Sequence, residues 1–435
     1  MQKLTHNIML DSWQKLVEKF TIENPKSLCN WLDTHSVMPG GNTRTVLHYD
    51  PFPVTLVKGK GSHLYDLDGH EYIDFLGEYS AGLYGHNNPK ILDVIKETMD
   101  SGLVLGGPNI WESKLASEIC SRFTSIEKVR FTNSGTEGNL MAIGAARAYT
   151  GRNDIMIFEG CYHGGVLNFK NDSSAIDAPY SFIKGIYNDV ESTIALIREN
   201  KTKLAAILLE PMLGGGGCIP ASLEFLRTIR EETIKCGICL IFDEVMTSRS
   251  SSGGLQKRLK IYPDITTLGK YIGGGLSFGA FGGRSDIMAN FDPTNLNSLR
   301  HAGTFNNNVL SMAAGYIGLK EVFSSEVAED LYQKGENFKL KLNQIIRKKK
   351  VSMQVTGVGS ILGIHCHSNK LSKPTTYDKF HSDKLKILHL EMMLSGFYFA
   401  QRGYMTLNIE TTDEDLDNFL DKFEKVISDN QHLLE

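Results

Sequence analysis

The stretch from residue 238 to residue 275, ICLIFDEVMTSRSSSGGLQKRLKIYPDITTLGKYIGGG, decides the fold class. Residues 238–242 form a short apolar run that two acids close, which is typical of a buried parallel strand. Lys270 follows Asp243 by 27 residues and stands in a loop that is rich in glycine. Open α/β sheets bind ligands at the carboxyl ends of their strands. We therefore expect Asp243 and Lys270 to lie together at such an edge.

Strand and helix patterns alternate on both sides of this stretch, from about 86 to 325, and predict a mainly parallel α/β sheet with covered faces. Between 45 and 76, apolar and polar residues alternate around Lys-Gly and Asp-Gly turns, which indicates small antiparallel strands. Beyond 326 the pattern is α+β. The strands predicted in the large sheet are 128–132, 155–159, 204–210 and 238–243, and the helices are 110–122, 134–149, 189–200 and 221–235.

These patterns divide the chain into three parts. We predict an N-terminal segment over 1–85, a large domain over 86–325 and a small C-terminal domain over 326–435. The N-terminal strands are expected to join the C-terminal domain. Within that domain we predict strands over 351–367 and 397–409, with a helix over 382–395 between them.

Composition excludes several classes of protein. The chain has 435 residues, of which 41% are hydrophobic and 22% charged, so two globular domains with large cores are expected. A net charge of -4 gives no reason to expect nucleic acid or a charged membrane surface as a partner, and no apolar run is long enough to span a membrane. The seven cysteines are scattered, which indicates reduced thiols and a cytoplasmic location. No metal site is expected, because Cys236 and Cys239 lack a second pair.

An anion site is predicted where a strand meets a helix at 132–137, TNSGTE. The first N–H groups of a helix are free to bind phosphate, and the helix dipole favours a negative charge there. Ser134 and Thr136 add hydroxyl groups, and Gly135 lets the backbone approach closely. The spacing of Ser134 and Glu137 also suits a simple helix cap.

A ring-binding site is predicted at the next strand end, in the segment GCYHGG over 160–165. Tyr162 is placed to stack on one face of a planar ring, and Val245, just after Asp243, to cover the other. His163 is expected nearby, either as a cofactor contact or as a hydrogen-bonded supporting group.

Phosphate, ring and lysine together predict pyridoxal 5′-phosphate (PLP) as the cofactor. The carboxylate of Asp243 would keep the pyridine nitrogen protonated, and the Lys270 amine would hold the aldehyde as a Schiff base. Once displaced by a substrate amine, Lys270 would move protons at the reacting carbon. Both residues are therefore predicted to be catalytic.

The chain resembles the class III aminotransferases, which are fold-type I PLP enzymes. The motifs TNSGTEGN, YHGG, LLEPMLGGGG, FDEVMTSR, TTLGKYIGGG and HAGTFNNN stand in the order and spacing of that family. Within it, the chain is most similar to the branch that contains the β-amino acid aminotransferases and glutamate-1-semialdehyde 2,1-aminomutase. Cys161 replaces a usual glycine and Gly138 a usual alanine, and neither change removes a chemical group from the site.

The resemblance implies features that the residues alone do not reveal. It implies a homodimer with shared active sites, in which Thr304 contacts the phosphate in the neighbouring subunit. It also implies that Glu210, in the Glu-Pro motif, supports the site near the lysine or the substrate. The small-molecule partners would be an amino acid and a 2-oxo acid.

Two arginines bear on the substrate. Arg44 lies in a glycine-rich turn and Arg402 between two predicted strands, and a guanidinium can bind a carboxylate through two parallel hydrogen bonds. Either arginine could instead form a surface ion pair. The resemblance implies that Arg44 binds the substrate carboxylate and Arg402 the α-carboxylate of the amino acceptor. Residues 78–80, Met246 and Ala400 are further pocket candidates.

Two carboxylate-binding arginines favour a ping-pong transaminase. It would move an amino group from a β-amino acid to a 2-oxo acid such as 2-oxoglutarate or pyruvate. The alternative is glutamate-1-semialdehyde 2,1-aminomutase, an isomerase, and a racemase or a non-catalytic PLP-binding protein are further alternatives. The donor's side chain, its stereochemistry and the preferred acceptor are not predicted.

Overall fold

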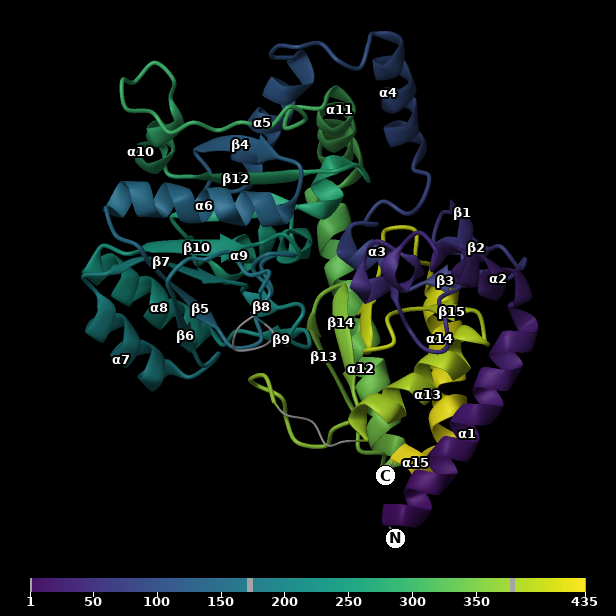
Figure 1. Ribbon diagram of the computed structural model, residues 1–435. Helices are drawn as coiled ribbons and strands as arrows, with labels where there is room; N and C mark the ends of the chain where they lie inside the picture. The colour runs from purple at the N-terminus through teal and green to yellow at the C-terminus, as the bar shows by residue number, and fades with distance from the viewer. Residues whose placement is uncertain (1, 170–174, 376–379, 435) are drawn as a thin grey trace.

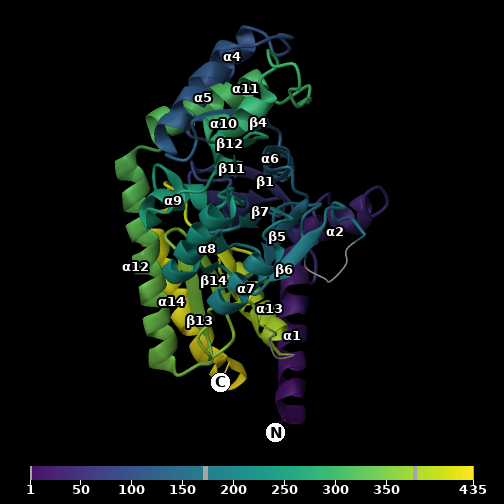
Figure 2. The same cartoon turned by 90° about the vertical axis from the view of Figure 1, so that its left-hand side faces the viewer.

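The computed structural model describes residues 2–169, 175–375 and 380–434. Figure 1 shows two parts side by side. One is built around a seven-stranded sheet, and in the other the two ends of the chain come together. The helix α1 (Gln2–Glu23) runs along the outside of the second part and packs against α13 (His381–Met393). Figure 2 shows the same molecule from the side, with α12 (Ser325–Lys349) along one edge.

The large sheet is mainly parallel, as predicted. Its order is β4-β12-β11-β10-β7-β5-β6, and β12 is the strand that runs antiparallel to both of its neighbours. The pairs β7–β10, β10–β11, β5–β7 and β5–β6 are parallel. The strands are β4 (Lys128–Thr132), β5 (Asp154–Phe158), β6 (Phe182–Gly185), β7 (Leu204–Leu209), β10 (Cys239–Asp243), β11 (Ile265–Gly269) and β12 (Gly279–Gly283).

The central strands are continuous apolar runs because both of their faces are covered. Every residue of β7 and of β10 is buried. Helix α6 packs across the sheet against β7, β11 and β12, while α7 and α8 pack on each other and against β6 and β10. The helices of this part are α4 (Pro89–Asp100), α5 (Ile110–Arg122), α6 (Gly135–Thr150), α7 (Val190–Asn200), α8 (Leu223–Cys236), α9 (Gly254–Leu259), α10 (Ser285–Met288) and α11 (Val309–Ile317).

Three strands of this sheet were not predicted from the sequence: β6, β11 and β12, of which β12 has the sequence GAFGG. Glycine weakens strands, so this segment has no strand pattern. The structure shows why glycine is needed there. A Cβ on Gly279 would lie 2.0 Å from the carbonyl oxygen of Ser134, and a Cβ on Gly283 would lie 2.2 Å from that of Asp264. Close approach of neighbouring backbone, rather than side-chain packing, selects these residues.

Strands from both ends of the chain form a common sheet in the second part. The order is β1-β2-β3-β15, and β15 pairs in parallel with β3. A three-stranded sheet of order β13-β14-β16 lies beside it, and a short pair joins β8 and β9. These strands are β1 (Leu56–Lys60), β2 (His63–Asp66), β3 (Glu71–Asp74), β8 (Met212–Leu213), β9 (Ile219–Pro220), β13 (Gln354–Val358), β14 (Ile361–His365), β15 (Phe397–Tyr398) and β16 (Tyr404–Thr406).

The strands predicted over 351–367 and 397–409 are each divided by a turn, and the real strands are shorter. The remaining helices are α2 (Pro25–Thr34), α3 (Gly77–Ser80), α14 (Asp413–Asp429) and α15 (Gln431–Leu434). The short 3₁₀ and π turns are η1 (Pro39–Gly41), η2 (Thr45–Leu47), η3 (Thr247–Ser250), η4 (Lys270–Gly273), η5 (Ala289–Phe291) and η6 (Gly318–Val322). In the described part of the chain, no helix is both long and apolar enough to cross a membrane.

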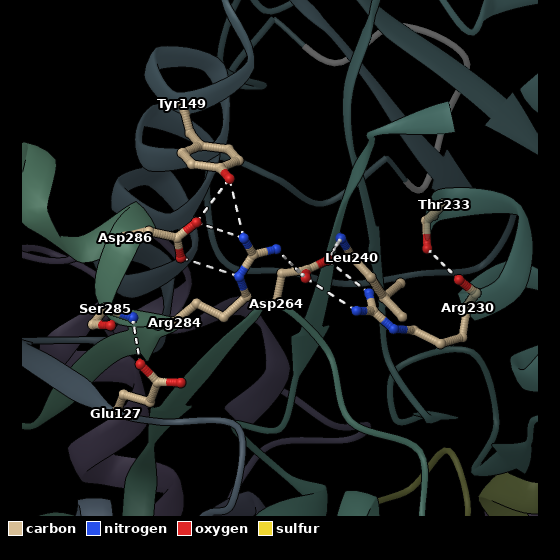
Figure 3. A network of polar contacts seen from close by, with 9 residues as sticks. All are labelled: Glu127, Tyr149, Arg230, Thr233, Leu240, Asp264, Arg284, Ser285 and Asp286. Atoms are coloured by element: carbon tan, nitrogen blue, oxygen red, sulfur yellow. Dashed lines mark hydrogen bonds and ion pairs between the residues drawn. The ribbon is translucent and has the colours of Figure 1, made fainter. Parts of the chain in front are cut away.

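A charged network ties the amino ends of β10 and β11 to their surroundings (Figure 3). Asp264, just before β11, accepts hydrogen bonds from Arg230 at 2.7 and 3.1 Å and from Arg284 at 3.0 Å. It also accepts one from the backbone N–H of Leu240 at 2.8 Å. Asp264 is buried, and its donors come from α8, from β10 and from the residue after β12. The network therefore fixes the positions of three neighbouring elements.

Candidate active site

The predicted site residues meet at the opposite, carboxyl edge of the large sheet. Asp243 is the last residue of β10 and Lys270 follows β11, so the parallel pairing of these strands brings them to one edge. A cavity of about 310 Å³ opens there. Among the residues that line it are Arg44, Ser134, Gly135, Thr136, Tyr162, His163, Glu210, Asp243, Val245 and Lys270.

The start of α6 forms one wall of the cavity. Ser134 is the helix cap, and its side chain accepts a hydrogen bond from the backbone N–H of Glu137 at 3.2 Å. The Glu137 carboxylate in turn accepts from the backbone N–H of Asn133 at 2.9 Å. The hydroxyl of Thr136 accepts from the backbone N–H of Gly165 at 3.1 Å. The helix is therefore capped, and Ser134, Gly135 and Thr136 line the cavity, so the start of the helix is in the position predicted for an anion site.

Gly135 lies against Val245, where a Cβ would come within 2.7 Å of the valine side chain. This contact places the anion-binding turn and the predicted ring-covering residue on the same side of the cavity. Tyr162 also lines the cavity, and 45% of its surface is exposed. An apolar side chain and an aromatic one are thus available to a planar ring.

Three donors converge on the buried carboxylate of Asp243. The side-chain amide of Asn139 donates at 2.7 Å, Nδ1 of His163 lies at 2.8 Å, and the backbone N–H of Val245 donates at 3.0 Å. Burial opposes a charge on His163, but its contacts with Cys161 and Asp243 raise its pKa well above the ordinary value. In the structure His163 therefore contacts the carboxylate and supports it.

The sequence analysis missed Asn139. Its side chain also donates to the carbonyl of His163 at 2.9 Å and accepts from the hydroxyl of Thr267 at 2.7 Å. It is buried within α6, next to Asp243. An amide on the apolar face of an alanine-rich helix requires partners, and that was the available signal.

Lys270 stands in the left-handed region of backbone conformation, with φ of 56°. Its Nζ donates to the carbonyl of Tyr79 at 2.6 Å. Burial, with the nearby guanidinium of Arg44, lowers the pKa of the Lys270 amine to about 8. A neutral amine is thus accessible at ordinary pH, as a nucleophile or a base requires.

Glu210 connects two loops at the cavity. Its carboxylate accepts from the backbone N–H of Tyr162 at 2.9 Å and from that of Gly214 at 2.8 Å. Burial raises the pKa of this carboxyl to about 7. Glu210 therefore holds the loop that carries Tyr162 in place.

The two arginines meet at one tyrosine. The guanidinium carbon of Arg44 lies 5.6 Å from the centre of the Tyr79 ring, and that of Arg402 lies 5.4 Å from it. Arg44 lines the cavity and is ion-paired with Glu78. Arg402 is exposed and is not among the described residues that line it.

Other predicted residues fall in different places. Glu78 and Met246 line the cavity, whereas Ser80 and Ala400 are buried and are not among the lining residues of the described chain. Thr304 is exposed outside it, and its contact with a neighbouring subunit stays a prediction. The same loop touches the anion-binding turn of its own chain, because Asn133 donates to Asn306 at 2.9 Å.

The chemistry of this set of side chains fits PLP. The first amides of α6 suit a phosphate, Tyr162 and Val245 suit the ring, Asp243 suits a ring nitrogen and Lys270 suits an aldehyde. All four receptors line one cavity. Each also carries the supporting hydrogen bonds that hold it in position.

Comparison with known proteins agrees with this geometry. A family model described as aminotransferase class-III matches residues 46–427. The β-phenylalanine transaminase of Variovorax paradoxus is 44% identical over 417 residues, which cover 96% of each chain. A solved structure of a β-phenylalanine aminotransferase from Variovorax paradoxus superimposes with a TM-score of 0.96 over 98% of this chain and 99% of that one, at 43% identity. A glutamate-1-semialdehyde 2,1-aminomutase of Methanopyrus kandleri is 33% identical over 424 residues, which cover 93% of this chain and 98% of that one.

Proposed function

The chain belongs to the class III aminotransferases and is a PLP-dependent transaminase with the fold-type I architecture, and from this premise we propose a β-amino acid as its amino donor. The acceptor is a 2-oxo acid such as 2-oxoglutarate or pyruvate, and the two substrates use one pocket in turn, by a ping-pong mechanism. The observation that supports this proposal is the pair of guanidinium groups, Arg44 and Arg402, at the single ring of Tyr79 beside the Lys270 amine.

Different residues of the cavity are assigned to different parts of the cofactor. Ser134, Gly135 and Thr136 would bind the phosphate, and Tyr162 and Val245 would contact the ring. Asp243 keeps the ring nitrogen protonated, held in position by His163 and Asn139. When bound, the cofactor supplies an electron sink for the bonds of the reacting carbon.

Lys270 is the residue that moves protons. Its amine, with a pKa of about 8, is neutral in about a tenth of molecules at pH 7 and in about half of them at pH 8. It lies beside Asp243 and inside the cavity, so it reaches the substrate carbon from a buried position. The carbonyl of Tyr79 accepts a hydrogen bond from this amine when the amine is not bound to the cofactor.

The arginines select the substrates. Arg44, in the cavity, binds the carboxylate of the β-amino acid, and Arg402 binds the α-carboxylate of the acceptor. One carboxylate-binding arginine for each substrate explains how two molecules of different length share a pocket.

A panel of half-reactions tests this function. Purified, PLP-loaded enzyme is mixed with single amino acids, among them 3-amino-3-phenylpropanoate, and the cofactor absorbance is followed. We expect conversion to the amine form with β-amino acids and release of the matching 3-oxo acid. Conversion by glutamate-1-semialdehyde or 4,5-diaminovalerate alone would make the chain an aminomutase instead.

Substitution of Arg402 distinguishes its role from that of Arg44. Arg402→Ala is expected to weaken the apparent affinity for the 2-oxo acid, measured as KM, by about 50-fold, in line with loss of a charged hydrogen-bonded pair, and that for the donor by less than about threefold. Steady-state kinetics with both substrates varied measures this. Equal effects on donor and acceptor would exclude the role of Arg402.

We also propose that two copies of the chain form a homodimer. Leu103, Val104, Leu105, Ile110 and Phe305 all expose much of their surface, and hydrogen bonds between Asn307 and Asn109 or Gly107 hold their two segments together. This apolar surface lies beside Thr304, which would then reach the phosphate in the partner's site. Light scattering on the purified protein tests the oligomeric state. A cytoplasmic location is proposed because the seven cysteines are scattered along the sequence, as is typical of reduced thiols.

A further inference from the structure

Residues 77–80, labelled α3, form a left-handed turn at the edge of the cavity. The φ angles of Gly77, Glu78, Tyr79 and Ser80 are 52°, 47°, 54° and 78°. Three of these residues carry side chains, and each such residue costs about 1–2 kcal/mol in this conformation. A run of three persists only where the surrounding structure holds it, and such strain concentrates at functional sites.

Several groups hold the turn from outside. The Asp74 carboxylate accepts from the backbone N–H groups of Leu76 and Gly77 at 2.8 and 2.9 Å. The buried Arg249 donates to the carbonyl of Ser80 at 3.2 Å and also to that of Leu407. The turn is therefore attached to β3 through Asp74, and through Arg249 it is joined to η3 and to the residue that follows β16.

The strained conformation directs Glu78 at Arg44. Their side chains form an ion pair, both line the cavity, and they are 56% and 43% exposed. The Tyr79 hydroxyl donates to the carbonyl of Val46 at 2.5 Å, which fixes the arginine's own segment against the turn. The guanidinium proposed to bind a substrate carboxylate is thus already bound to a carboxylate of the protein.

We propose that Glu78 is a specificity-determining residue: an internal carboxylate that occupies Arg44 until the carboxylate of the amino donor displaces it. This inference rests on the proposed function, in which Arg44 binds that carboxylate. Exchange of one carboxylate for another leaves the charge at Arg44 compensated throughout. When an acceptor with a single carboxylate binds at Arg402, Glu78 returns to Arg44.

The charge of Arg44 needs a compensating carboxylate because the Lys270 amine lies in the same cavity. Lys270 is buried in the same cavity, and the guanidinium of Arg44 lowers the pKa of its amine. An unpaired Arg44 would also favour any anion that enters the cavity. Glu78 therefore competes with any entering carboxylate for Arg44. Only a carboxylate whose molecule makes further contacts in the pocket binds strongly enough to displace it.

The test uses a pair of substitutions at one position. Glu78→Asn removes the charge and Glu78→Asp keeps it, and both new residues tolerate the left-handed conformation. The probe is 3-phenylpropionate, which has a carboxylate and no amine, titrated into PLP-loaded enzyme by calorimetry. Glu329→Gln is the control, because Glu329 is 50% exposed and pairs with Arg258, and neither lines the cavity within the described chain.

We expect Glu78→Asn to bind the probe about fivefold more tightly than the unchanged enzyme, as loss of an exposed competing pair predicts. Glu78→Asp, whose shorter carboxylate reaches Arg44 less well, should bind the probe more tightly by less than about threefold, and Glu329→Gln should stay within about twofold. For the amino donor used in the half-reaction panel, the apparent affinity in steady-state kinetics should rise by the same factor in Glu78→Asn.

Equal or weaker binding of the probe by Glu78→Asn would overturn the inference and make Glu78 a mere support of Arg44. Failure of the proposed function looks different, because the unchanged enzyme would then not convert β-amino acids at all. If Glu78→Asn does not fold, Glu78→Asp carries the test. Its shorter carboxylate reaches Arg44 less well, so binding tightened by less than about threefold supports the inference, and weakened binding overturns it.

Discussion

The two ends of the strand pair β10 and β11 are built in opposite ways. At the amino ends, the buried Asp264 is surrounded by two guanidinium groups and a backbone N–H (Figure 3). At the carboxyl ends, the buried Lys270 amine donates to one carbonyl, and burial together with nearby arginines lowers its pKa. The same strands thus carry a stabilised charge at one end and a destabilised one at the other.

The difference shows that one end of the strand pair stabilises the fold and the other end carries the reactive group. Burial opposes the charge of Asp264, but Arg230, the backbone of Leu240 and Arg284 more than offset this, and its pKa is lowered. For an acid, a lowered pKa means that the charged form is stabilised. For Lys270, a lowered pKa means that the charged form is destabilised, and the reactive neutral amine is favoured. Substitutions at the two ends test this contrast, and their expected effects differ widely in size.

Lys270→Ala should have the largest effect. It removes the residue that holds the cofactor and moves the proton, so kcat/KM for transamination should fall by at least about 10⁴-fold. Circular dichroism should show an unchanged fold. A rate within about tenfold of the unchanged enzyme would exclude Lys270 as the Schiff-base residue.

Asp243→Asn and Asp264→Asn form a matched pair, because both aspartates are buried at opposite ends of the same strands. Asp243→Asn removes the charge that faces the ring nitrogen, and kcat/KM should fall by about 10³-fold. Asp264→Asn should leave kcat/KM within about twofold. A comparable loss of rate in both variants would mean that the two ends do not differ in function.

Asp264→Asn should instead reduce stability. It leaves two guanidinium groups without their carboxylate, and the free energy of unfolding should fall by about 3 kcal/mol in urea titrations near neutral pH. Since the folded-state pKa of Asp264 lies below its unfolded value, its contribution is present above about pH 4 and is lost as the pH falls through the folded value. The difference between the two proteins should therefore narrow below about pH 4. If the difference in the free energy of unfolding stays constant through this range, the charge of Asp264 is not the cause of the lost stability.

Lys270→Met should raise the free energy of unfolding of the cofactor-free protein, whereas Asp264→Asn lowers it. This is the smallest of the expected effects. Burial lowers the pKa of Lys270 from an ordinary value of 10.5 to about 8, so near neutral pH the folded state carries a charge at a cost of about 3 kcal/mol. Methionine should raise the free energy of unfolding by about 2 kcal/mol. The folded state binds fewer protons than the unfolded one between about pH 8 and 10.5, so the gain should shrink as pH rises through that window. A loss of stability near neutral pH would contradict the contrast between the two ends.

The sequence predicted which residues line the cavity better than it predicted the strands and the charged network around them. Asp243 closes an apolar run, and a parallel sheet brings such strand ends to one edge. The sequence places Lys270 in a glycine-rich loop, and it does not predict β11, the strand that precedes this residue. The strand predicted over 128–132 is confirmed as β4 without change. The network at Asp264 had no local pattern, because its partners lie 34 and 20 residues away in the chain.

What the sequence by itself determined is the class of sheet and the cofactor chemistry, because these depend on contiguous runs and motifs. Tertiary structure alone decided which distant groups meet. Asn139 reaches Asp243 across 104 residues, and Glu78 reaches Arg44 across 34. The left-handed turn that directs Glu78 opposes the local preference of its own residues, so local patterns predict against it. The contacts of Asp74 and Arg249, made only in the folded chain, hold that turn.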